Sequence, residues 1–276
     1  MTIIDAHHHL WTADYPWLAG AALAPIRRDY TVEDLRVHLA KAGIDRTVLV
    51  EAARCDDAET TEFLALAAAT PEIAGVVGWA SLTSPDLAET LTRHRSGVGG
   101  HLLVGIRDQA QGQPDDVLDD PAVRAGIATV DSFGLVNELV VRQAQLPSVA
   151  RLAADLPDAR FVLDHLGKPA IASGGWGDWR ALIAPVAAAP NVVAKLSGLV
   201  AEADWATWSV HDLRPYVDTA LELFGPERLM FGSDWPVCEV AATYEQVVEA
   251  MAAILGGRPA EIFGGTAMRA YGLEIA

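Results

Sequence analysis

The sequence alternates between short runs rich in β-branched residues and segments of helical periodicity, and this alternation restricts the folds open to it. The runs expected to be strands are residues 2–8, 47–52, 75–80, 102–107, 135–141, 161–165, 192–197 and 228–234. The segments between them are long enough for crossover helices, so consecutive strands are expected to be parallel. Eight such units in 276 residues predict an α/β fold, a closed (β/α)8 barrel, whose usual size is about 250 residues.

Start and stop signals for helices appear between these runs. Thr31 is expected to cap a helix that has Asp34 in its first turn, and Gly43 is expected to follow its last residue. Two more helices are expected to start at a capped proline, at Ser84-Pro85 and Asp120-Pro121. Other intervening segments carry apolar residues three or four apart, which is typical of amphipathic helices.

A doubly wound open sheet is the main alternative fold. It would require a glycine-rich turn after the first strand to approach a pyrophosphate, whereas residues 7–11 read HHHLW. The glycine-rich segment 173–179 follows a Lys168-Pro169 turn and is expected to be a flexible loop at the barrel rim. Because the chain shows no linker and no shift in composition, residues 1–276 are expected to form a single domain.

Composition excludes some classes of function. The formal net charge of −17 argues against nucleic-acid binding, which requires a basic face. The longest uncharged run, residues 181–194, is interrupted by two prolines and is too short to span a membrane. The first residues lack the features of a secretory signal, and Cys55 and Cys238 make no disulfide framework. A cytoplasmic protein is therefore expected.

Ionisable residues interrupt four of the apolar runs at their C-terminal ends. In a (β/α)8 barrel the reactive side chains come from these ends and from the loops just after them. The polar groups are therefore candidates for one common site. They are His7–His9 in the first run, Arg107 in the fourth, Asp164-His165 in the sixth and Ser233-Asp234 in the eighth.

The histidine triplet divides by strand geometry. Side chains alternate across a strand, so His7 and His9 share one face, and His8 takes the other. If the first pair points into the barrel mouth, His165 and Asp234 can converge on it. Three imidazoles and a carboxylate are suitable first ligands for zinc or a similar divalent ion.

Other polar residues near these runs have simpler interpretations. His8 is expected to face the surrounding helices as a hydrogen-bonded structural residue. Asp5 is expected to orient the strand end or to support a ligand from behind. The remaining histidines are expected at surface or packing positions, and they are His38, His94, His101 and His211.

Several motifs resemble those of the amidohydrolase superfamily. They are DAHHHLW and YPWL near the start, VLDHLGKP in the middle, and RLMFGSDWPVC and IFGGTAMRAYGL near the end. The similarity is to the amidohydrolase-2 lactonases, which include L-fuconolactonase, rhamnonolactonase-type enzymes and 2-pyrone-4,6-dicarboxylate lactonase. It spans nearly the whole chain and implies the same (β/α)8 barrel.

The resemblance also implies roles for individual residues. His7 and His9 correspond to the H-x-H pair of strand one, His165 to the histidine of strand six and Asp234 to the aspartate of strand eight. These four would hold a divalent metal, zinc or manganese, although metal-free catalysis by the imidazoles with Arg107 stays open. Arg107 would hold or polarise the lactone.

Two positions depart from the family pattern. Relatives often carry histidine after the strand-four arginine and glutamine at the end of strand two, where this chain has Asp108 and Glu51. Both changes are expected to add a carboxylate near the mouth. A strongly anionic substrate, such as a dicarboxylate lactone, is therefore not expected.

The resulting hypothesis is hydrolysis of a small sugar-acid lactone. Asp234 would take a proton from the attacking water and pass it to the leaving alkoxide. A metal-dependent decarboxylase and a barrel that only binds a sugar acid or a protein stay open as alternatives. So do the particular lactone and the oligomeric state. The residues expected to contact sugar hydroxyls are Arg142, Gln145, Trp79 and Trp11.

Overall fold

A computed structural model describes residues 2–274 and shows an eight-stranded parallel sheet in which the strands follow the order of the sequence. This arrangement confirms the predicted barrel. The strands are β1 (Ile4–His8), β2 (Arg46–Val50), β3 (Ile73–Gly78), β4 (Leu103–Asp108), β5 (Val136–Leu139), β6 (Phe161–Leu163), β7 (Val192–Leu196) and β8 (Leu229–Phe231).

The barrel closes between β1 and the residues that follow β8. The backbone N–H of Asp234 donates to the carbonyl of His7 at 2.8 Å, and that of His9 donates to the carbonyl of Trp235 at 2.7 Å. This seam places the end of the histidine triplet directly beside Asp234.

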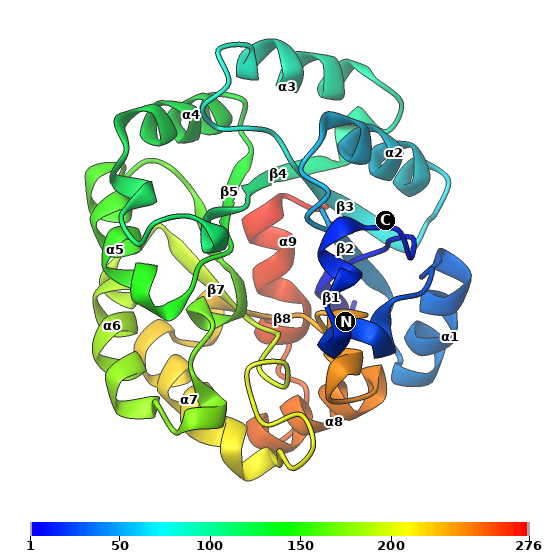
Figure 1. Ribbon diagram of the computed structural model, residues 1–276, viewed down its shortest axis with the longest axis vertical. Coiled ribbons are helices and arrows are strands. Elements are labelled where there is room, and N and C mark those ends of the chain that lie inside the picture. Colours follow the sequence, from blue (N-terminus) through cyan, green and yellow to red (C-terminus); the bar gives the residue numbers. More distant parts are fainter. Residues whose placement is uncertain (1, 275–276) are drawn as a thin grey trace.

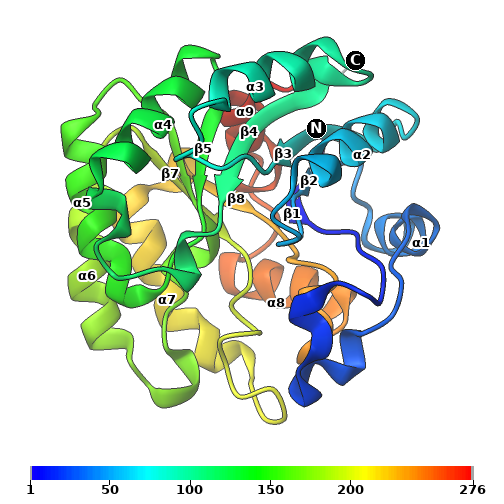
Figure 2. The ribbon, with the colours of Figure 1, turned by 45° about the horizontal axis from the view of Figure 1, so that its top comes forward.

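In the part of the chain that the structure describes, eight α-helices surround the strands, and a ninth lies across the middle of the ring (Figure 1). Figure 2 shows the segment after β1, in dark blue, beside the orange segment that leads into α8. The helices are α1 (Val32–Ala42), α2 (Asp57–Ala68), α3 (Leu87–Ser96), α4 (Pro121–Ser132), α5 (Leu146–Asp155), α6 (Trp176–Ala188), α7 (Val210–Phe224), α8 (Tyr244–Leu255) and α9 (Thr266–Tyr271).

A bulge in β1 determines which histidines face the barrel interior. Ile4 and Ala6 belong to an apolar cluster with residues of α9, so plain alternation would next turn His8 inward. The pairing register with β2 instead shifts between Asp5 and His8. A bulge adds one residue and turns the following side chains over, so His7 faces the interior.

The helix caps agree with the sequence at two of the three predicted starts. Thr31 and Asp34 form a capping box at the start of α1, and Asp120 caps α4 with Pro121 in its first turn. The prediction at Ser84-Pro85 is wrong, because α3 begins two residues later, at Leu87. The Ser84 hydroxyl instead accepts a hydrogen bond from the N–H of Asp86 within a turn.

The segment 173–179 was expected to be a flexible rim loop, and this prediction is also wrong. Helix α6 begins at Trp176, and the side chain of Trp179 is fully buried. Its indole N–H donates to the carbonyl of Leu166 at 2.8 Å. The segment therefore anchors α6 beneath the turn that follows β6. None of the helices in residues 2–274 has the length and apolar character needed to cross a bilayer.

Candidate active site

Three imidazoles and one carboxylate meet at the C-terminal end of the barrel. Oδ1 of Asp234 lies 3.6 Å from Nε2 of His7, 3.5 Å from Nε2 of His9 and 3.9 Å from Nε2 of His165. The two Nε2 atoms of His7 and His9 are 3.1 Å apart. All four side chains are at least nine-tenths buried. The structure thus brings together the four residues that the sequence singled out as candidate ligands.

Local backbone conformation aims two of these side chains. β6 and β8 end earlier than predicted, and His165 and Asp234 follow them in turns with φ of 52° and 57°. Such left-handed conformations are costly for residues with side chains and concentrate at functional sites. Gly198 is required opposite them, because a Cβ there would lie 2.6 Å from Nδ1 of His165.

Hydrogen bonds orient the imidazoles from behind. Nδ1 of His9 donates to the carbonyl of Val50 at 3.0 Å, and Nδ1 of His165 lies 2.8 Å from the hydroxyl of Ser197. Each ring therefore directs its Nε2 towards Asp234. Support of this kind fixes the tautomer and orientation of a ligand histidine.

A network of buried charges lies directly beneath the cluster. Nζ of Lys195 lies 2.9 Å from Nδ1 of His7, 2.6 Å from Oε1 of Glu138 and 3.1 Å from Oδ1 of Asp164. The same Asp164 oxygen lies 3.2 Å from Nδ1 of His7. His7 is thus held on its lower side by an ammonium and a carboxylate.

Arg107 belongs to the same network. Its guanidinium donates through Nη1 to Oδ2 of Asp164 at 2.8 Å, through Nη2 to the carbonyl of Glu51 at 2.7 Å, and through Nε to the Glu51 carboxylate. Glu51 and Asp164 have no exposed side-chain surface. The predicted substrate-binding arginine is therefore bound mainly by the protein itself.

The environment sets the protonation of the cluster near neutral pH. Burial lowers the pKa of His165 to about 4, and burial together with the ammonium of Lys195 holds the pKa of His7 well below its usual range. Burial opposes ionisation of Asp234, but His165 and His9 keep its pKa below the ordinary value. His7 and His165 are therefore neutral and Asp234 is ionised, as metal binding and general-base catalysis both require.

The donor set fits a divalent metal. His7, His9 and Asp234 each offer a ligand atom within 4.8 Å of the others, and all three are buried. Two ligands about 2.0–2.1 Å from a tetrahedral zinc ion lie about 3.3 Å apart. The observed separations of 3.1, 3.5 and 3.6 Å are close to that value.

A cavity of about 270 Å³ opens above the cluster. Its polar lining comes from the end of β4 and from the loops after β1, β4 and β6. Its apolar wall includes Trp17, whose indole N–H donates to the carbonyl of Ala52 at 2.8 Å. The lining side chains are His9, Trp17, Ala52, Ala53, Arg107, Gln109, Gln111, Val140, His165, Lys168 and Val237.

Four residues expected to contact sugar hydroxyls lie outside that lining. Gln145 is fully buried, and its amide donates to the carbonyl of Ala110 at 2.8 Å. Arg142 is exposed and donates to the carbonyl of Gln113 at 3.2 Å. Trp11 is buried in an aromatic cluster, and the indole N–H of Trp79 donates to Asp108 at 3.1 Å.

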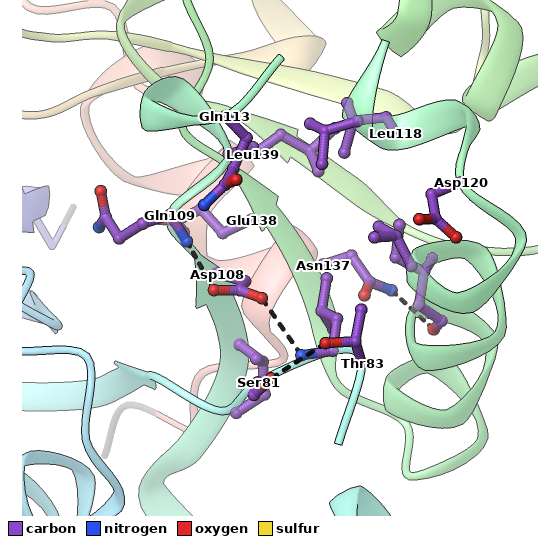
Figure 3. Close-up of a pocket in the computed structure, with 16 residues that line it drawn as sticks. Ser81, Thr83, Asp108, Gln109, Gln113, Leu118, Asp120, Asn137, Glu138 and Leu139 are labelled. Atoms are coloured by element: carbon purple, nitrogen blue, oxygen red, sulfur yellow. Dashed lines mark hydrogen bonds between the residues drawn. The ribbon is translucent and has the colours of Figure 1, made fainter. Parts of the chain in front are cut away.

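Glu51 and Asp108 are the two positions that depart from the family pattern, and they do not both add a carboxylate to the mouth of the barrel. Glu51 is neutralised by Arg107, and Asp108 accepts a hydrogen bond from the N–H of Leu82 at 3.2 Å. Figure 3 shows Asp108 in a different cavity, of about 350 Å³, together with Ser81, Thr83 and Asn137. The expectation about Asp108 is corrected, because its strand position turns it away from the inward-facing Arg107.

Sequence reasoning missed Lys195, Glu138, Lys168 and Trp17, and it assigned no role to Asp164. The first two carried a signal, since each is a single charged residue inside an apolar run expected to be buried on both faces. Lys168 and Trp17 lie in the motifs VLDHLGKP and YPWL, but only the folded loops show that they reach the same cavity.

Comparison with known proteins agrees with this geometry. A family model described as Amidohydrolase matches residues 4–273. The chain is 39% identical to L-fucono-1,5-lactonase of Burkholderia multivorans, over 98% of this chain and 96% of that protein. It is 35% identical to L-fucono-1,5-lactonase of Burkholderia ambifaria, over 87% and 82% respectively. A crystal structure of a Burkholderia multivorans amidohydrolase with bound zinc is similar with a TM-score of 0.92 and 38% identity, covering 99% of this chain and 100% of that one.

Proposed function

Because this chain belongs to the amidohydrolase family, we propose that it is a lactonase that opens the ring of a sugar-acid lactone, with L-fucono-1,5-lactone as the leading candidate. The observation that carries the proposal is the position of Asp234. Its ionised carboxylate lies within 3.9 Å of three imidazoles, at the end of the barrel where such folds carry out chemistry. The full-length similarity to two L-fucono-1,5-lactonases supports the choice of substrate class.

Asp234 is the general acid and base in this proposal. Its carboxylate accepts a proton from a water molecule, and the water oxygen forms a bond to the lactone carbonyl carbon. When the tetrahedral intermediate collapses, the bond between that carbon and the ring oxygen breaks. Asp234 returns its proton to the ring oxygen, and the product is the open hydroxy acid. Proton transfer by a positioned group typically contributes 10²- to 10⁴-fold to the rate.

His7, His9, His165 and Asp234 would hold the divalent metal, zinc or manganese. Such an ion polarises a carbonyl oxygen and lowers the pKa of water to about 7. The buried carboxylate of Asp164 supports His7 from behind, and the carbonyl of Val50 supports His9. These contacts preserve the arrangement of the donors whether or not an ion is present.

The cavity lining suits an uncharged polyhydroxy ring. Gln109 and Gln111 offer amide donors and acceptors, and Trp17 offers an apolar surface against which a sugar ring can pack. Arg107 lines the cavity, but its guanidinium is paired with the buried carboxylate of Glu51 and is not free to bind a second carboxylate on the substrate. Among the residues that the structure describes, Lys168 is then the one ammonium in the cavity lining, so neutral aldonolactones are expected to be preferred over dicarboxylate lactones.

A pH-indicator assay tests the proposal. L-fucono-1,5-lactone, other aldonolactones and a dicarboxylate lactone are supplied to the protein, and acid release is followed above the spontaneous rate. We expect release from the L-fucono substrate, its loss after treatment with a chelator, and its return with zinc or manganese. Failure to release acid from any lactone would reject the proposed function. Turnover that is insensitive to chelator would remove the metal from it, and carbon dioxide release from a small aromatic acid would favour a decarboxylase.

A further inference from the structure

We propose that Lys168, rather than Arg107, is the cation that contacts the carbonyl oxygen of the substrate and stabilises the negative charge that develops there. This inference rests on the proposed lactonase function and deepens it. It concerns the hydrogen-bond donor for the oxyanion, a role that the sequence had suggested for Arg107. The two residues line the same cavity but differ in what already binds them.

The guanidinium of Arg107 is already hydrogen-bonded to other groups of the protein. Its three nitrogens donate to the carboxylates of Glu51 and Asp164 and to the backbone carbonyl of Glu51. Both carboxylates are fully buried, so turning the guanidinium towards a substrate would take from Glu51 the one ion-pair partner it has among the described residues and leave Asp164 with Lys195 alone. Breaking a buried ion pair from one side is strongly unfavourable. Arg107 is therefore a positioning residue that fixes Glu51 and Asp164.

Lys168 has no comparable partner. Nζ lies 3.9 Å from Oε1 of Glu202, beyond hydrogen-bonding distance, and both side chains are partly exposed. In the part of the chain that the structure describes, no other carboxylate lies within ion-pair distance of this nitrogen. Such a long, partly exposed pair is weak, so the ammonium can turn towards a bound substrate at little cost.

The turn after β6 places Lys168 at the cavity. His165, Leu166, Gly167 and Lys168 all have positive φ, and the N–H of Lys168 donates to the carbonyl of His165 at 2.9 Å. This turn reverses the chain within a few residues and returns Lys168 to the cavity that His165 lines. A left-handed backbone at non-glycine residues is typical of sites where side-chain placement matters.

The charge of Lys168 reaches the catalytic cluster. Burial raises the pKa of Glu202, and the ammonium of Lys168 counteracts that rise. Lys168 and His165 line the same cavity, and Nε2 of His165 lies 3.9 Å from Oδ1 of Asp234, so the ammonium is close enough to act on negative charge that forms on a substrate bound there.

The role in the reaction follows from charge balance. When the water oxygen bonds to the carbonyl carbon, the electron pair of the C=O bond moves to the carbonyl oxygen. Lys168 donates a hydrogen bond to that oxygen and keeps its proton. As the ring C–O bond breaks, the electron pair returns to re-form the carbonyl, and the ammonium then lies against the carboxylate product. Without substrate, the Lys168 ammonium lies 3.9 Å from Oε1 of Glu202.

Kinetics of Lys168→Met on L-fucono-1,5-lactone test the inference. Loss of one preorganised oxyanion donor typically lowers kcat by about 10²- to 10³-fold. We expect a fall of that size with KM changed by less than about threefold, because the interaction forms in the transition state. Lys168→Arg should recover part of kcat. Lys41→Met is the matched control, since Lys41 is exposed and its Nζ lies 3.9 Å from Oε1 of Glu245, the same separation as that between Lys168 and Glu202.

The possible outcomes distinguish the role of Lys168 from the proposed lactonase function. If wild type releases acid and Lys168→Met does so at the same kcat, the inference is wrong and the lactonase function stands. A raised KM with unchanged kcat would also overturn it, because Lys168 would then only hold the ground state. If wild type opens no lactone, the proposed function itself fails. Equal unfolding midpoints for Lys168→Met and Lys41→Met show that a loss of kcat is not a loss of folding.

Discussion

The two ends of the barrel interior have opposite chemistry. At the N-terminal end of the strands, Ile4, Val48 and Met230 pack with Tyr271 of α9 in an apolar cluster with almost no exposed surface. At the C-terminal end the inward positions carry imidazoles and carboxylates. The same strands supply both ends. Residues at one end of the sheet therefore mainly stabilise the fold, and residues at the other end provide the reactive groups.

Between the two ends lies the layer of buried ions. Lys195 binds Glu138 and Asp164, and burial together with Asp164 raises the pKa of Glu138 to about 7. This layer is expected to affect both the stability of the fold and the reaction, because the ammonium of Lys195 also contacts His7. Variants in each layer should therefore separate loss of folding from loss of turnover.

The largest effect on the free energy of unfolding is expected in this ionic layer. Lys195→Met removes the ammonium and leaves Glu138 and Asp164 buried without it. Breaking a buried pair from one side costs about 3–5 kcal/mol. Urea unfolding measures the change, with Lys41→Met as control. A loss below about 1 kcal/mol would mean that the network does not stabilise the fold.

A change at the apolar end should lower stability and spare turnover. Ile4 is fully buried, and Ile4→Ala removes methyl groups whose loss costs about 3 kcal/mol in a packed core. Urea unfolding and steady-state kinetics on the folded variant measure the two effects. A fall in kcat as large as that of Asp234→Asn would contradict the separation of stability and reactivity between the two ends of the barrel.

Glu59 should make stability depend on pH at the mouth of the barrel. It accepts hydrogen bonds from Tyr15 and Ala52, and burial raises its pKa from 4.5 to about 7. The folded state therefore holds a proton that the unfolded state has lost between these values, so wild-type stability falls as pH rises through this window.

Glu59→Gln removes this dependence. Relative to wild type, the variant should gain about 2 kcal/mol of unfolding free energy between pH 5.5 and pH 8.5. Urea unfolding at the two pH values measures the gain. A difference between the two proteins that stays constant with pH would contradict the raised pKa.

The smallest effect on the free energy of unfolding is expected in the surrounding helices, away from both ends of the barrel. The carboxylate of Asp120 accepts the N–H of Ala122 at 2.7 Å, whereas Ser84 caps no helix. Asp120→Ala should cost about 1 kcal/mol and Ser84→Ala less than half of that. Thermal unfolding compares them. Equal losses would show that the Asp120 cap adds nothing.

Much of the fold could be predicted because strand–helix alternation and strand periodicity are local properties. The eight strands and the pairing of His7 with His9 on one face follow from them. The bulge that turns His7 inward could not be predicted, since the contacts around it join distant parts of the chain. The Asp5 carboxylate there accepts a hydrogen bond from the N–H of Ser233, across the barrel seam.

The sequence could not show which of several possible partners a long polar side chain contacts. The sequence placed Arg107 at the mouth but could not show that Glu51 and Asp164 occupy its donors. Likewise Gln145 lies near a strand end, yet its amide binds backbone carbonyls of the loop after β4. Such choices depend on contacts between residues far apart in the chain.

The most direct test of the account is the kcat/KM of Asp234→Asn for L-fucono-1,5-lactone, measured beside wild type with equal metal content and equal unfolding midpoints. Asparagine tolerates the left-handed conformation of residue 234, so the fold should be preserved. The account predicts a fall of about 10²- to 10⁴-fold. Acid release within threefold of wild type would contradict the assignment of the reaction to this end of the barrel.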